Sequence, residues 1–266
     1  KAGKVIMHVR EPFSNGALGL RTNIFRAQMK KYADCIITIS QDNAKRIDIP
    51  EKTVVIYNYS AVPENITSQN AYASKKALYL GGAARIKGFY TMVESLDYLD
   101  KDVKIYFGGN YVSSKSSFNG IRQIIKSIIP SSRKQNAAVR KINNHPNAIV
   151  LGITNNVGKY LDEVCCLISP FSVPHFSRPV IEAHLHKKPV IVTDIEGMDE
   201  IVHHEVNGLI IPKDNPRALA AAINTLTSAP KKAKILGEAG YDVAVNKFTP
   251  KNIEQFQLIY EKLLFL

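Results

Sequence analysis

The residues best suited to chemistry lie between two apolar runs, Val164–Ile168 and Pro189–Thr193. Between these runs, Ser177 is placed to cap a helix, and Pro179 lies in the first turn, where a missing N–H costs nothing. The unpaired N–H groups at such a helix start bind anions. Glu182 lies about one turn further on and is placed to accept hydrogen bonds from sugar hydroxyls. Together these features predict a nucleotide-sugar site.

A second candidate is the glycine-rich segment Gly81-Gly-Ala-Ala-Arg-Ile-Lys-Gly88, which follows an apolar run and opens a helical stretch. Its backbone amides and the cations Arg85 and Lys87 are able to approach one phosphate group. The segment fits neither the dinucleotide-binding nor the P-loop spacing, so a dehydrogenase or P-loop enzyme is unsupported. Taken alone, a glycine turn with solvated cations explains it equally well.

Short apolar segments alternate with helical ones along the chain, which predicts an α/β fold with parallel sheets covered on both faces. The expected strands are Lys4–Val9, Cys35–Ile39, Thr53–Tyr57, Ala77–Leu80, Val103–Phe107, Ala148–Leu151, Val164–Ile168, Val190–Val192 and Leu209–Ile211. The expected helices are Leu20–Tyr32, Gln41–Ile47, Phe89–Leu99, Val157–Glu163, the stretch after Ser177, Pro216–Leu226, Lys231–Lys247 and Pro250–Leu264.

A polar connector at residues 58–74 divides this alternation. We expect a partial α/β segment over residues 1–62 and a larger domain over residues 75–247. A last helix within residues 250–266 is expected to pack back toward the first segment. Because the chain opens with Lys1 and enters a strand almost directly, we interpret it as a fragment of a longer protein.

The net charge of +12 points to anionic partners such as nucleotide phosphates, nucleic acid or a membrane surface. Much of the imbalance is local, because no Asp or Glu lies between Val103 and Leu161. Nucleic acid is disfavoured as a partner, because no aromatic stacking pattern or known module accompanies the charge.

Within the same basic region, one apolar helical face is predicted, formed by Ile121, Ile124, Ile125, Ile128 and Ile129. Membrane docking would use this face, but packing against the sheet is favoured.

No apolar run is long enough for a membrane span or a signal peptide. The three cysteines cannot form a disulfide framework, so we expect a cytoplasmic protein, with the inner face of the membrane as an alternative location. Four histidines have no cysteine partners, and we interpret them as surface helix residues: His184, His186, His203 and His204. We therefore predict no metal site and no cofactor.

Several motifs occur together in a characteristic order. They are the Gly81–Gly88 loop, Ile149–Gly152, Ser169–Phe171, Phe176 with Glu182-Ala, Lys188–Ile191, and Asp199–Val202 followed by Asn207–Ile210. In this the chain resembles the family 4 glycosyltransferases, which are retaining enzymes of the GT-B fold. The resemblance covers about residues 75–247 as the donor-binding domain. Ala33-Asp34, Ile37–Ser40 and Val55–Asn58 resemble the end of that family's N-terminal domain. The resemblance to this family implies a Rossmann-like GT-B sheet domain with a truncated second α/β segment.

The resemblance also implies a role for individual positions. The donor diphosphate would be bound by Gly81, Gly82, Arg85, Lys87, Ser177 and Arg178. The nucleoside would be bound by Gly152, Ile153, Thr154 and Glu182, the last of which matches the second glutamate of the family's paired-glutamate motif. The first glutamate of that motif, which contacts the transferred sugar, falls on Pro174, and His175 and Phe176 are the neighbouring candidates for sugar contact.

On the N-terminal side, Arg10 and Glu11 end the first expected strand, where the family often has a histidine near the reacting sugar. A charged pair at the carboxyl end of a parallel strand suits catalysis. Mutual surface pairing accounts for it equally well, and His8 would then point into the core.

The resulting prediction is a glycosyltransferase that moves a sugar from a nucleotide diphosphate sugar to a glycan or lipid-linked acceptor, with retention and without metal. Peripheral membrane contact is kept as a hypothesis. Two alternatives remain open. One is a non-catalytic nucleotide-sugar-binding or partner subunit, because Pro174 has no side-chain acceptor. The other is a nucleotide-sugar epimerase of the same fold.

Overall fold

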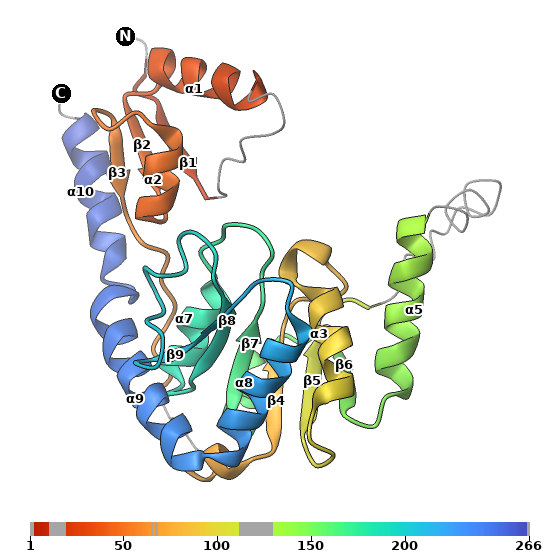
Figure 1. The fold of residues 1–266 in the computed structure, drawn as a ribbon. Helices are drawn as coiled ribbons and strands as arrows, with labels where there is room; N and C mark the ends of the chain where they lie inside the picture. Colours follow the sequence, from red (N-terminus) through yellow and green to blue (C-terminus); the bar gives the residue numbers. More distant parts are fainter. Residues whose placement is uncertain (1–2, 11–19, 65, 67–68, 112–129, 265–266) are drawn as a thin grey trace.

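The computed structural model describes residues 3–10, 20–64, 66, 69–111 and 130–264 (Figure 1). Two parallel sheets are present in this part of the chain, one of six strands and one of three. The predicted α/β class with parallel sheets is therefore confirmed. None of the described helices is long and apolar enough to cross a membrane.

The larger sheet has the strand order β6-β5-β4-β7-β8-β9. Its strands are β4 (Lys76–Tyr79), β5 (Lys104–Gly108), β6 (Ala148–Gly152), β7 (Cys166–Ser169), β8 (Val190–Thr193) and β9 (Gly208–Ile211). All neighbouring pairs are parallel. The chain adds β5 and β6 on one side of β4 and then returns to place β7 on the other side, so the strand order reverses between β4 and β7.

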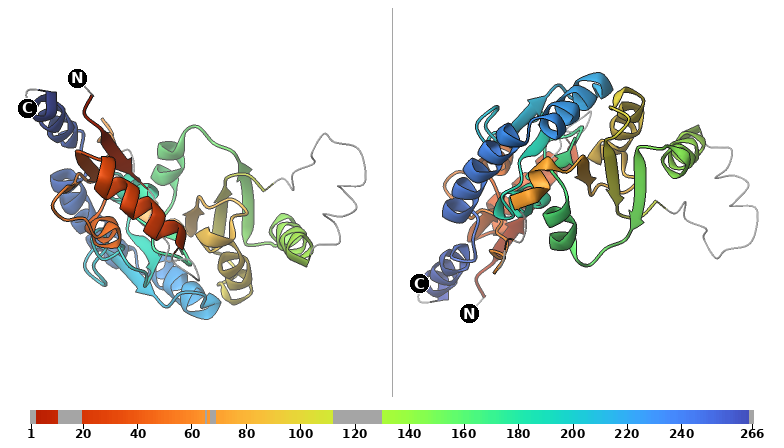
Figure 2. Two further views of the ribbon diagram at one scale, coloured as in Figure 1. Left: turned by 90° about the horizontal axis from the view of Figure 1, so that it is seen from above. Right: turned by 90° about the horizontal axis from the view of Figure 1, so that it is seen from below.

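Each face of this sheet has its own hydrophobic core. Alternate residues of a strand point to opposite faces, and accordingly Ala77 and Tyr79 belong to one cluster while Leu78 belongs to the other. The strands are apolar on both sides because both faces are covered by helices. Figure 2 shows the sheet between its helices from two further directions.

The helices of the larger domain fall into two layers. Residues of α3 (Phe89–Ser95), α5 (Pro130–Asn144) and α8 (Pro216–Ser228) pack in one core. Residues of α6 (Val157–Glu163) and α7 (Arg178–Leu185) pack in the other. The long helix α9 (Pro230–Lys247) contributes residues to both cores. The described residues also form three short 3-10 helices, which are η1 (Gln69–Ala73), η2 (Arg85–Lys87) and η3 (Leu96–Tyr98).

The smaller sheet has the order β1-β2-β3, with β1 (Ile6–Val9), β2 (Cys35–Thr38) and β3 (Thr53–Val55). Helices α1 (Leu20–Tyr32) and α2 (Gln41–Ile47) belong to this segment. The last helix, α10 (Asn252–Leu264), lies along the same sheet (Figure 1). A small apolar cluster joins α10 to the sheet, made by Cys35, Ile37, Ile56, Phe256, Ile259 and Leu263.

The structure differs from the sequence predictions at His8 and in two helical elements. His8 is exposed and stacks on Phe256 of α10, with ring centroids 5.5 Å apart, instead of pointing into the core. Helix α5 was not expected, and the 3-10 helix η1 lies inside the expected connector. The apolar face expected at Ile121–Ile129 lies outside the described residues.

Candidate functional site

The carboxyl ends of β4 and β7 lie side by side at the point where the strand order reverses. In open α/β sheets, ligands bind in the crevice outside the strands at such a point. The two loops that the sequence singles out follow these two strands. The topology therefore brings both candidate loops to one place.

The loop after β4 is shaped by glycine. Gly82 and Gly88 have φ angles of 58° and 71°, in the left-handed region that glycine adopts most easily. A Cβ on Gly81 would lie 1.9 Å from the Tyr79 hydroxyl, and one on Gly88 would lie 1.8 Å from the carbonyl oxygen of Pro170. Side chains at these positions would therefore collide with the strand below or with the loop after β7.

Tyr79 supports this loop from beneath. Its hydroxyl oxygen lies 3.2 Å from the carbonyl oxygen of Gly82 and 3.1 Å from that of Lys87. Burial raises the pKa of Tyr79 well above its ordinary value, so the hydroxyl stays protonated and able to donate. The support holds η2 in place, from which Lys87 reaches the crevice while Arg85 is exposed. Of the two cations predicted to bind a diphosphate, Lys87 is therefore the better placed.

The loop after β7 is held by side-chain contacts. The His175 ring stacks on the Phe171 ring, with centroids 4.0 Å apart and planes 11° from parallel. Phe171 is fixed in turn, because the Thr193 hydroxyl donates to its carbonyl oxygen at 2.5 Å. These contacts orient His175 toward the same crevice as Lys87.

The electrostatic setting of His175 follows from these neighbours. Burial, and to a smaller extent the nearby charge of Lys87, together lower the pKa of His175 to about 4. The imidazole is therefore neutral at physiological pH, with one nitrogen donating and the other accepting. A neutral imidazole is suited to hydrogen bonds with sugar hydroxyls.

The two loops close around a small cavity that we call the switch-point cavity. It has a volume of about 60 Å³ and is lined by Gly81, Lys87, Phe171, His175 and Pro179 among others. The backbone N–H of Ser172 donates to the carbonyl oxygen of Ile86 at 3.0 Å, which joins the loops directly. The space holds about two waters' volume, so it suits a group of about phosphate size and not a whole nucleotide.

The start of α7 borders this cavity through Pro179. Ser177 occupies the N-cap position, as predicted, but its side chain makes no capping hydrogen bond. Instead, its buried hydroxyl lies 3.1 Å from that of Ser169. Arg178, the first residue of the helix, donates through Nε to Glu182 Oε1 at 2.8 Å. The first turn thus leaves its amides without a side-chain cap and carries an ion pair.

Of the four residues predicted to bind the nucleoside, Glu182 lies on α7, and the other three lie at the carboxyl end of β6. Gly152 has φ 74°, and its carbonyl oxygen accepts the N–H of Gly109 at 2.7 Å. Ile153 is 76% exposed. Gly152 and Ile153 border a separate cavity of about 740 Å³ beside α5, with Arg140 as its described cation. Thr154, the third of these residues, accepts a hydrogen bond from the N–H of Asn156 at 3.2 Å.

Phe176 is placed differently from the prediction of sugar contact. Its ring is 4% exposed and packs against Tyr57 and Phe248, at centroid distances of 5.7 and 5.8 Å. The side chain therefore belongs to the core. There it packs against one residue that precedes the larger domain, Tyr57, and one that follows α9, Phe248. The ring of Phe176 is therefore not available to contact a sugar.

The prediction that four histidines lie on the surface is wrong for His184, which is fully buried. Its Nε2 lies 3.1 Å from the carbonyl oxygen of Asn207, and burial lowers its pKa to about 4. His186 pairs with Asp162 at 3.0 Å, while His203 and His204 are exposed. Among the described residues, no group of three or more His, Cys, Asp or Glu side chains is arranged to hold a metal.

Arg10, one of the two catalytic candidates, follows β1 and is exposed. Its Nη2 lies 3.4 Å from Asn58 Oδ1, a residue of the connector between the two sheets. Glu11, the other candidate, lies outside the described residues.

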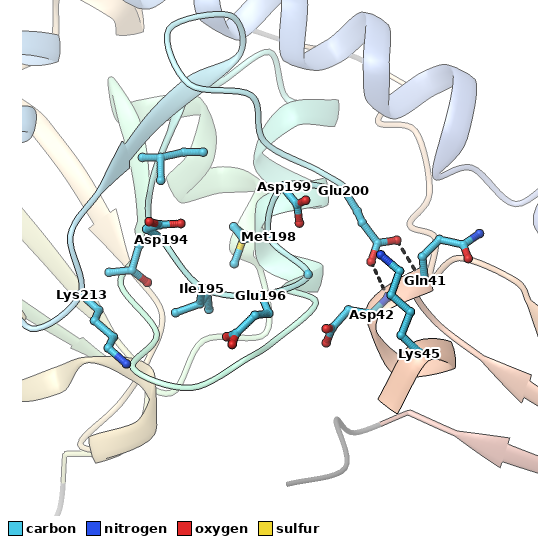
Figure 3. Close-up of a pocket in the computed structure, with 13 residues that line it drawn as sticks. Gln41, Asp42, Lys45, Asp194, Ile195, Glu196, Met198, Asp199, Glu200 and Lys213 are labelled. Atoms are coloured by element: carbon cyan, nitrogen blue, oxygen red, sulfur yellow. Dashed lines mark hydrogen bonds between the residues drawn. The ribbon is translucent and has the colours of Figure 1, made fainter. Parts of the chain in front are cut away.

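The region of the carboxyl edge beyond β8 and β9 faces α2 of the smaller segment. Figure 3 shows this pocket, which has a volume of about 590 Å³ and which we call the acidic pocket. Among its lining residues, five carboxylates outnumber two lysines: Asp42, Asp194, Glu196, Asp199 and Glu200 against Lys45 and Lys213.

Glu200 joins the larger domain to α2 across this pocket. Its two carboxylate oxygens accept the backbone N–H groups of Gln41 and Asp42, each at 2.8 Å (Figure 3). These amides have no partner within the helix, and an acidic side chain at a helix N-terminus is favourable. Glu200 therefore caps a helix that is 158 residues away in the sequence.

Sequence reasoning did not assign roles to Tyr79, Phe171 or Glu200. Tyr79 gives a weak signal, because a tyrosine at the end of an apolar strand needs a partner for its hydroxyl. Phe171 and Glu200 give no local signal of their contacts, because their partners lie on other elements. Glu200 falls within a motif quoted above, but its contact with α2 depends on how the two sheets are arranged.

Comparison with known proteins agrees with this geometry. The sequence profile of the family described as glycosyl transferases group 1 matches residues 63–243. The match begins in the connector and covers every strand of the larger sheet.

The individual proteins that match this chain are only distantly similar to it in sequence. An uncharacterized glycosyltransferase of Methanocaldococcus jannaschii is 24% identical over 264 residues, which is 97% of this chain and 69% of the relative. HepE of Anabaena, solved in complex with UDP-glucose, superposes with a TM-score of 0.77 at 20% identity, over 99% of this chain and 72% of that one. Sucrose-phosphate synthase of Thermosynechococcus elongatus has a TM-score of 0.75 at 21% identity, over 92% and 62% of the two chains. The Rossmann-like GT-B fold is thus confirmed.

Proposed function

The chain belongs to the glycosyl transferases group 1 family, and on that premise we propose that it transfers a sugar from a nucleotide diphosphate sugar to a hydroxyl-bearing acceptor. The observation that carries the proposal is the switch-point cavity, where Lys87, His175 and the start of α7 come together. HepE, a protein of the same fold, was solved with UDP-glucose. This supports a nucleotide-sugar donor, with UDP-glucose as the first compound to test.

In this proposal the protein stabilises the charge of the departing diphosphate. As the bond between the sugar and the diphosphate breaks, negative charge grows on the leaving oxygen. In this proposal that charge is stabilised by Lys87, which lines the cavity, and by the amides at the start of α7, which borders it. Such groups do the work that a divalent metal does in other transferases, so we propose that the step proceeds without metal.

We propose that the acceptor binds on the side of the smaller segment. We also propose that the reaction retains the anomeric configuration, as in the family 4 enzymes that the chain resembles. Arg10 is exposed and directly follows β1, at the carboxyl end of this strand. We assign Arg10 and Glu11 to the acceptor side. Glycan or lipid-linked acceptors fit this assignment, and peripheral membrane contact belongs to the same proposal.

A cytoplasmic location completes the proposal. All three cysteines of the chain, Cys35, Cys165 and Cys166, are buried and unpaired. Free thiols are typical of proteins that work in a reducing compartment.

One observation favours a second function, which is nucleotide-sugar binding without transfer. Pro174 stands where the related enzymes have a glutamate that contacts the sugar, and proline offers no side-chain acceptor. His175 is the neighbouring group in the cavity that is able to accept a hydrogen bond in its place. The two functions therefore differ in whether His175 supports turnover.

The direct test is a thermal-shift panel of UDP-, GDP-, ADP- and CDP-sugars on the wild type, Lys87→Ala and Glu182→Ala. We expect one nucleotide class to raise the Tm of the wild type and to have a much smaller effect on both variants. No shift by any nucleotide would contradict the donor site.

Product analysis then separates the functions. Release of free sugar or transfer to an acceptor, with the anomer identified by NMR, would support the transferase. Binding without either product would favour the non-catalytic subunit, and an epimerised nucleotide sugar would show an epimerase instead.

A further inference from the structure

The ion pair between Arg178 and Glu182 is markedly uneven. The side chain of Arg178 is 63% exposed, while that of Glu182 is only 18% exposed. Within the described part of the chain, neither side chain has another hydrogen-bond or ion-pair partner. Surface pairs with this i, i+4 spacing contribute little to stability, so the contact is better explained by what it does to the carboxylate.

The atoms that form the bond leave others unused on both residues. Arg178 donates through Nε to Glu182 Oε1, so its two Nη groups still have donors to offer. Glu182 keeps Oε2 and the second lone pair of Oε1 as acceptors. Both residues lie in the first turns of α7, on one side of the helix, and the amides beside them have no side-chain cap.

The charge of Arg178 also affects how the Glu182 carboxylate would interact with a bound diphosphate. The proposed donor carries a diphosphate at the start of α7, next to the carboxylate that is to bind the ribose. A carboxylate without a partner would repel this diphosphate. The guanidinium of Arg178 offsets the negative charge of Glu182, and its planar fork is able to span a carboxylate and a phosphate at once.

We propose that Arg178 is a positioning residue that orients the Glu182 carboxylate toward the ribose hydroxyls and offsets its charge beside the diphosphate. The inference rests on the proposed function, because it assigns a ribose and a diphosphate to this site. It adds that recognition of the ribose depends on an exposed arginine that need not contact the ribose itself.

The two effects are separable with two substitutions. Arg178→Ala removes both the orientation and the charge. Arg178→Lys keeps the positive charge but loses the Nε donor and the planar fork that fix the carboxylate. Because Arg178 is exposed, neither substitution opens a cavity in the core, and a thermal melt of each variant checks that it folds.

The test compares the affinities of UDP and 2′,3′-dideoxy-UDP for the wild type, Arg178→Ala, Arg178→Lys and Glu182→Ala by titration calorimetry. The ratio of the two dissociation constants reports hydrogen bonds to the ribose hydroxyls. Lys234→Ala is the matched control, because Lys234 and Glu238 form an exposed i, i+4 pair at 3.7 Å on α9.

We expect the wild type to prefer UDP by about tenfold or more, as one or two hydrogen bonds to a charged group would give. Glu182→Ala should abolish the preference, and Arg178→Ala should reduce it below about threefold. Arg178→Lys should recover part of the overall affinity for UDP but not the preference. Lys234→Ala should behave as the wild type.

A preference that survives in Arg178→Ala while Glu182→Ala loses it would overturn the positioning role. A preference that survives in Glu182→Ala would overturn it too, because Glu182 would then not read the ribose. If UDP fails to bind the wild type, the ADP and GDP pairs are compared in the same way. Failure of every nucleotide to bind would contradict the proposed function itself, an outcome that is distinct from a changed ratio.

Discussion

Two regions of the carboxyl edge of the larger sheet, one at its centre and one at the side of β8 and β9, have opposite character. Beyond β4 and β7, the switch-point cavity contains Lys87 and a neutral His175, and no carboxylate is among the described residues that line it. Beyond β8 and β9, the acidic pocket has five carboxylates and two lysines. Both regions lie at the ends of parallel strands of the same sheet, so the difference lies in the loops.

The difference shows how one edge serves two tasks. The region beyond β4 and β7 is made of glycine turns and an uncapped helix start, which suits an anionic ligand. The region beyond β8 and β9 uses a carboxylate to hold the smaller segment, because Glu200 caps α2. If the proposed function holds, binding of the donor and attachment of the other segment are separated along the sheet.

The largest effect should come from Gly88→Ala. The added methyl group would meet the carbonyl oxygen of Pro170 at a position with φ 71°, so the two loops must move apart. We expect the free energy of unfolding to fall by about 3–5 kcal/mol, as is typical when a crowded backbone position with positive φ gains a side chain. Urea unfolding monitored by circular dichroism measures this.

Gly152→Ala is the matched control. Gly152 also has a positive φ, 74°, but an added Cβ would meet nothing within 4 Å. Its cost should be limited to the conformational strain of about 1–2 kcal/mol. Equal losses for the two variants would contradict the close packing of the loops around the cavity.

A smaller effect is expected from Glu200→Ala, in the other region of the edge. The variant loses two hydrogen bonds between a carboxylate and the amides of Gln41 and Asp42. We expect the free energy of unfolding to fall by about 1–3 kcal/mol and these two amides to exchange hydrogen faster. Hydrogen exchange followed by NMR or mass spectrometry measures the protection.

The control for this prediction is Glu196→Ala. Its carboxylate is 69% exposed and lies 4.0 Å from Arg46, so its loss should change stability little. Unchanged protection of Gln41 and Asp42 in Glu200→Ala would show that Glu200 does not hold α2.

The smallest effect concerns pH. Burial lowers the pKa of His175 from 6.5 to about 4, so between these values the unfolded chain binds more protons than the folded one. Stability should therefore fall as the pH falls from 6.5 to about 4. His184 contributes in the same direction.

His175→Phe removes one of these groups and keeps a ring to stack on Phe171. We expect the free energy of unfolding to depend less steeply on pH in this window than it does in the wild type. A slope equal to that of the wild type would show that His175 is not held neutral beside Lys87.

Much of this arrangement could be predicted from the sequence. Short apolar strands and amphipathic helices follow local rules of periodicity, and the predicted helix bounds are met at Leu20–Tyr32, Gln41–Ile47 and Val157–Glu163. Glycines that precede a helix, and a serine followed by a proline, indicate a loop and a helix start from the neighbouring residues alone. These signals located both loops of the switch-point cavity, because each loop lies directly after its own strand.

The parts that escaped prediction depend on contacts between distant elements. Phe176 lies in a loop, and nothing nearby in the sequence shows that its ring packs against Tyr57 and Phe248. His184 lies between Ala183 and Leu185, and nothing in this local sequence shows that α7 packs on α9 or that His184 is buried near Asn207. Helix α5 was missed because its described buried apolar residues are few, chiefly Ala138 and Ile142.

The most direct test of the account is the affinity of UDP for the wild type, Lys87→Ala and Lys213→Ala, measured by titration calorimetry. Lys87 lines the switch-point cavity and Lys213 lines the acidic pocket, so the two variants remove the same charge from the two regions of one edge. We predict that Lys87→Ala weakens binding at least about tenfold and that Lys213→Ala changes it by less than about twofold. An equal or greater loss in Lys213→Ala would contradict the assignment of the donor to the cavity between β4 and β7.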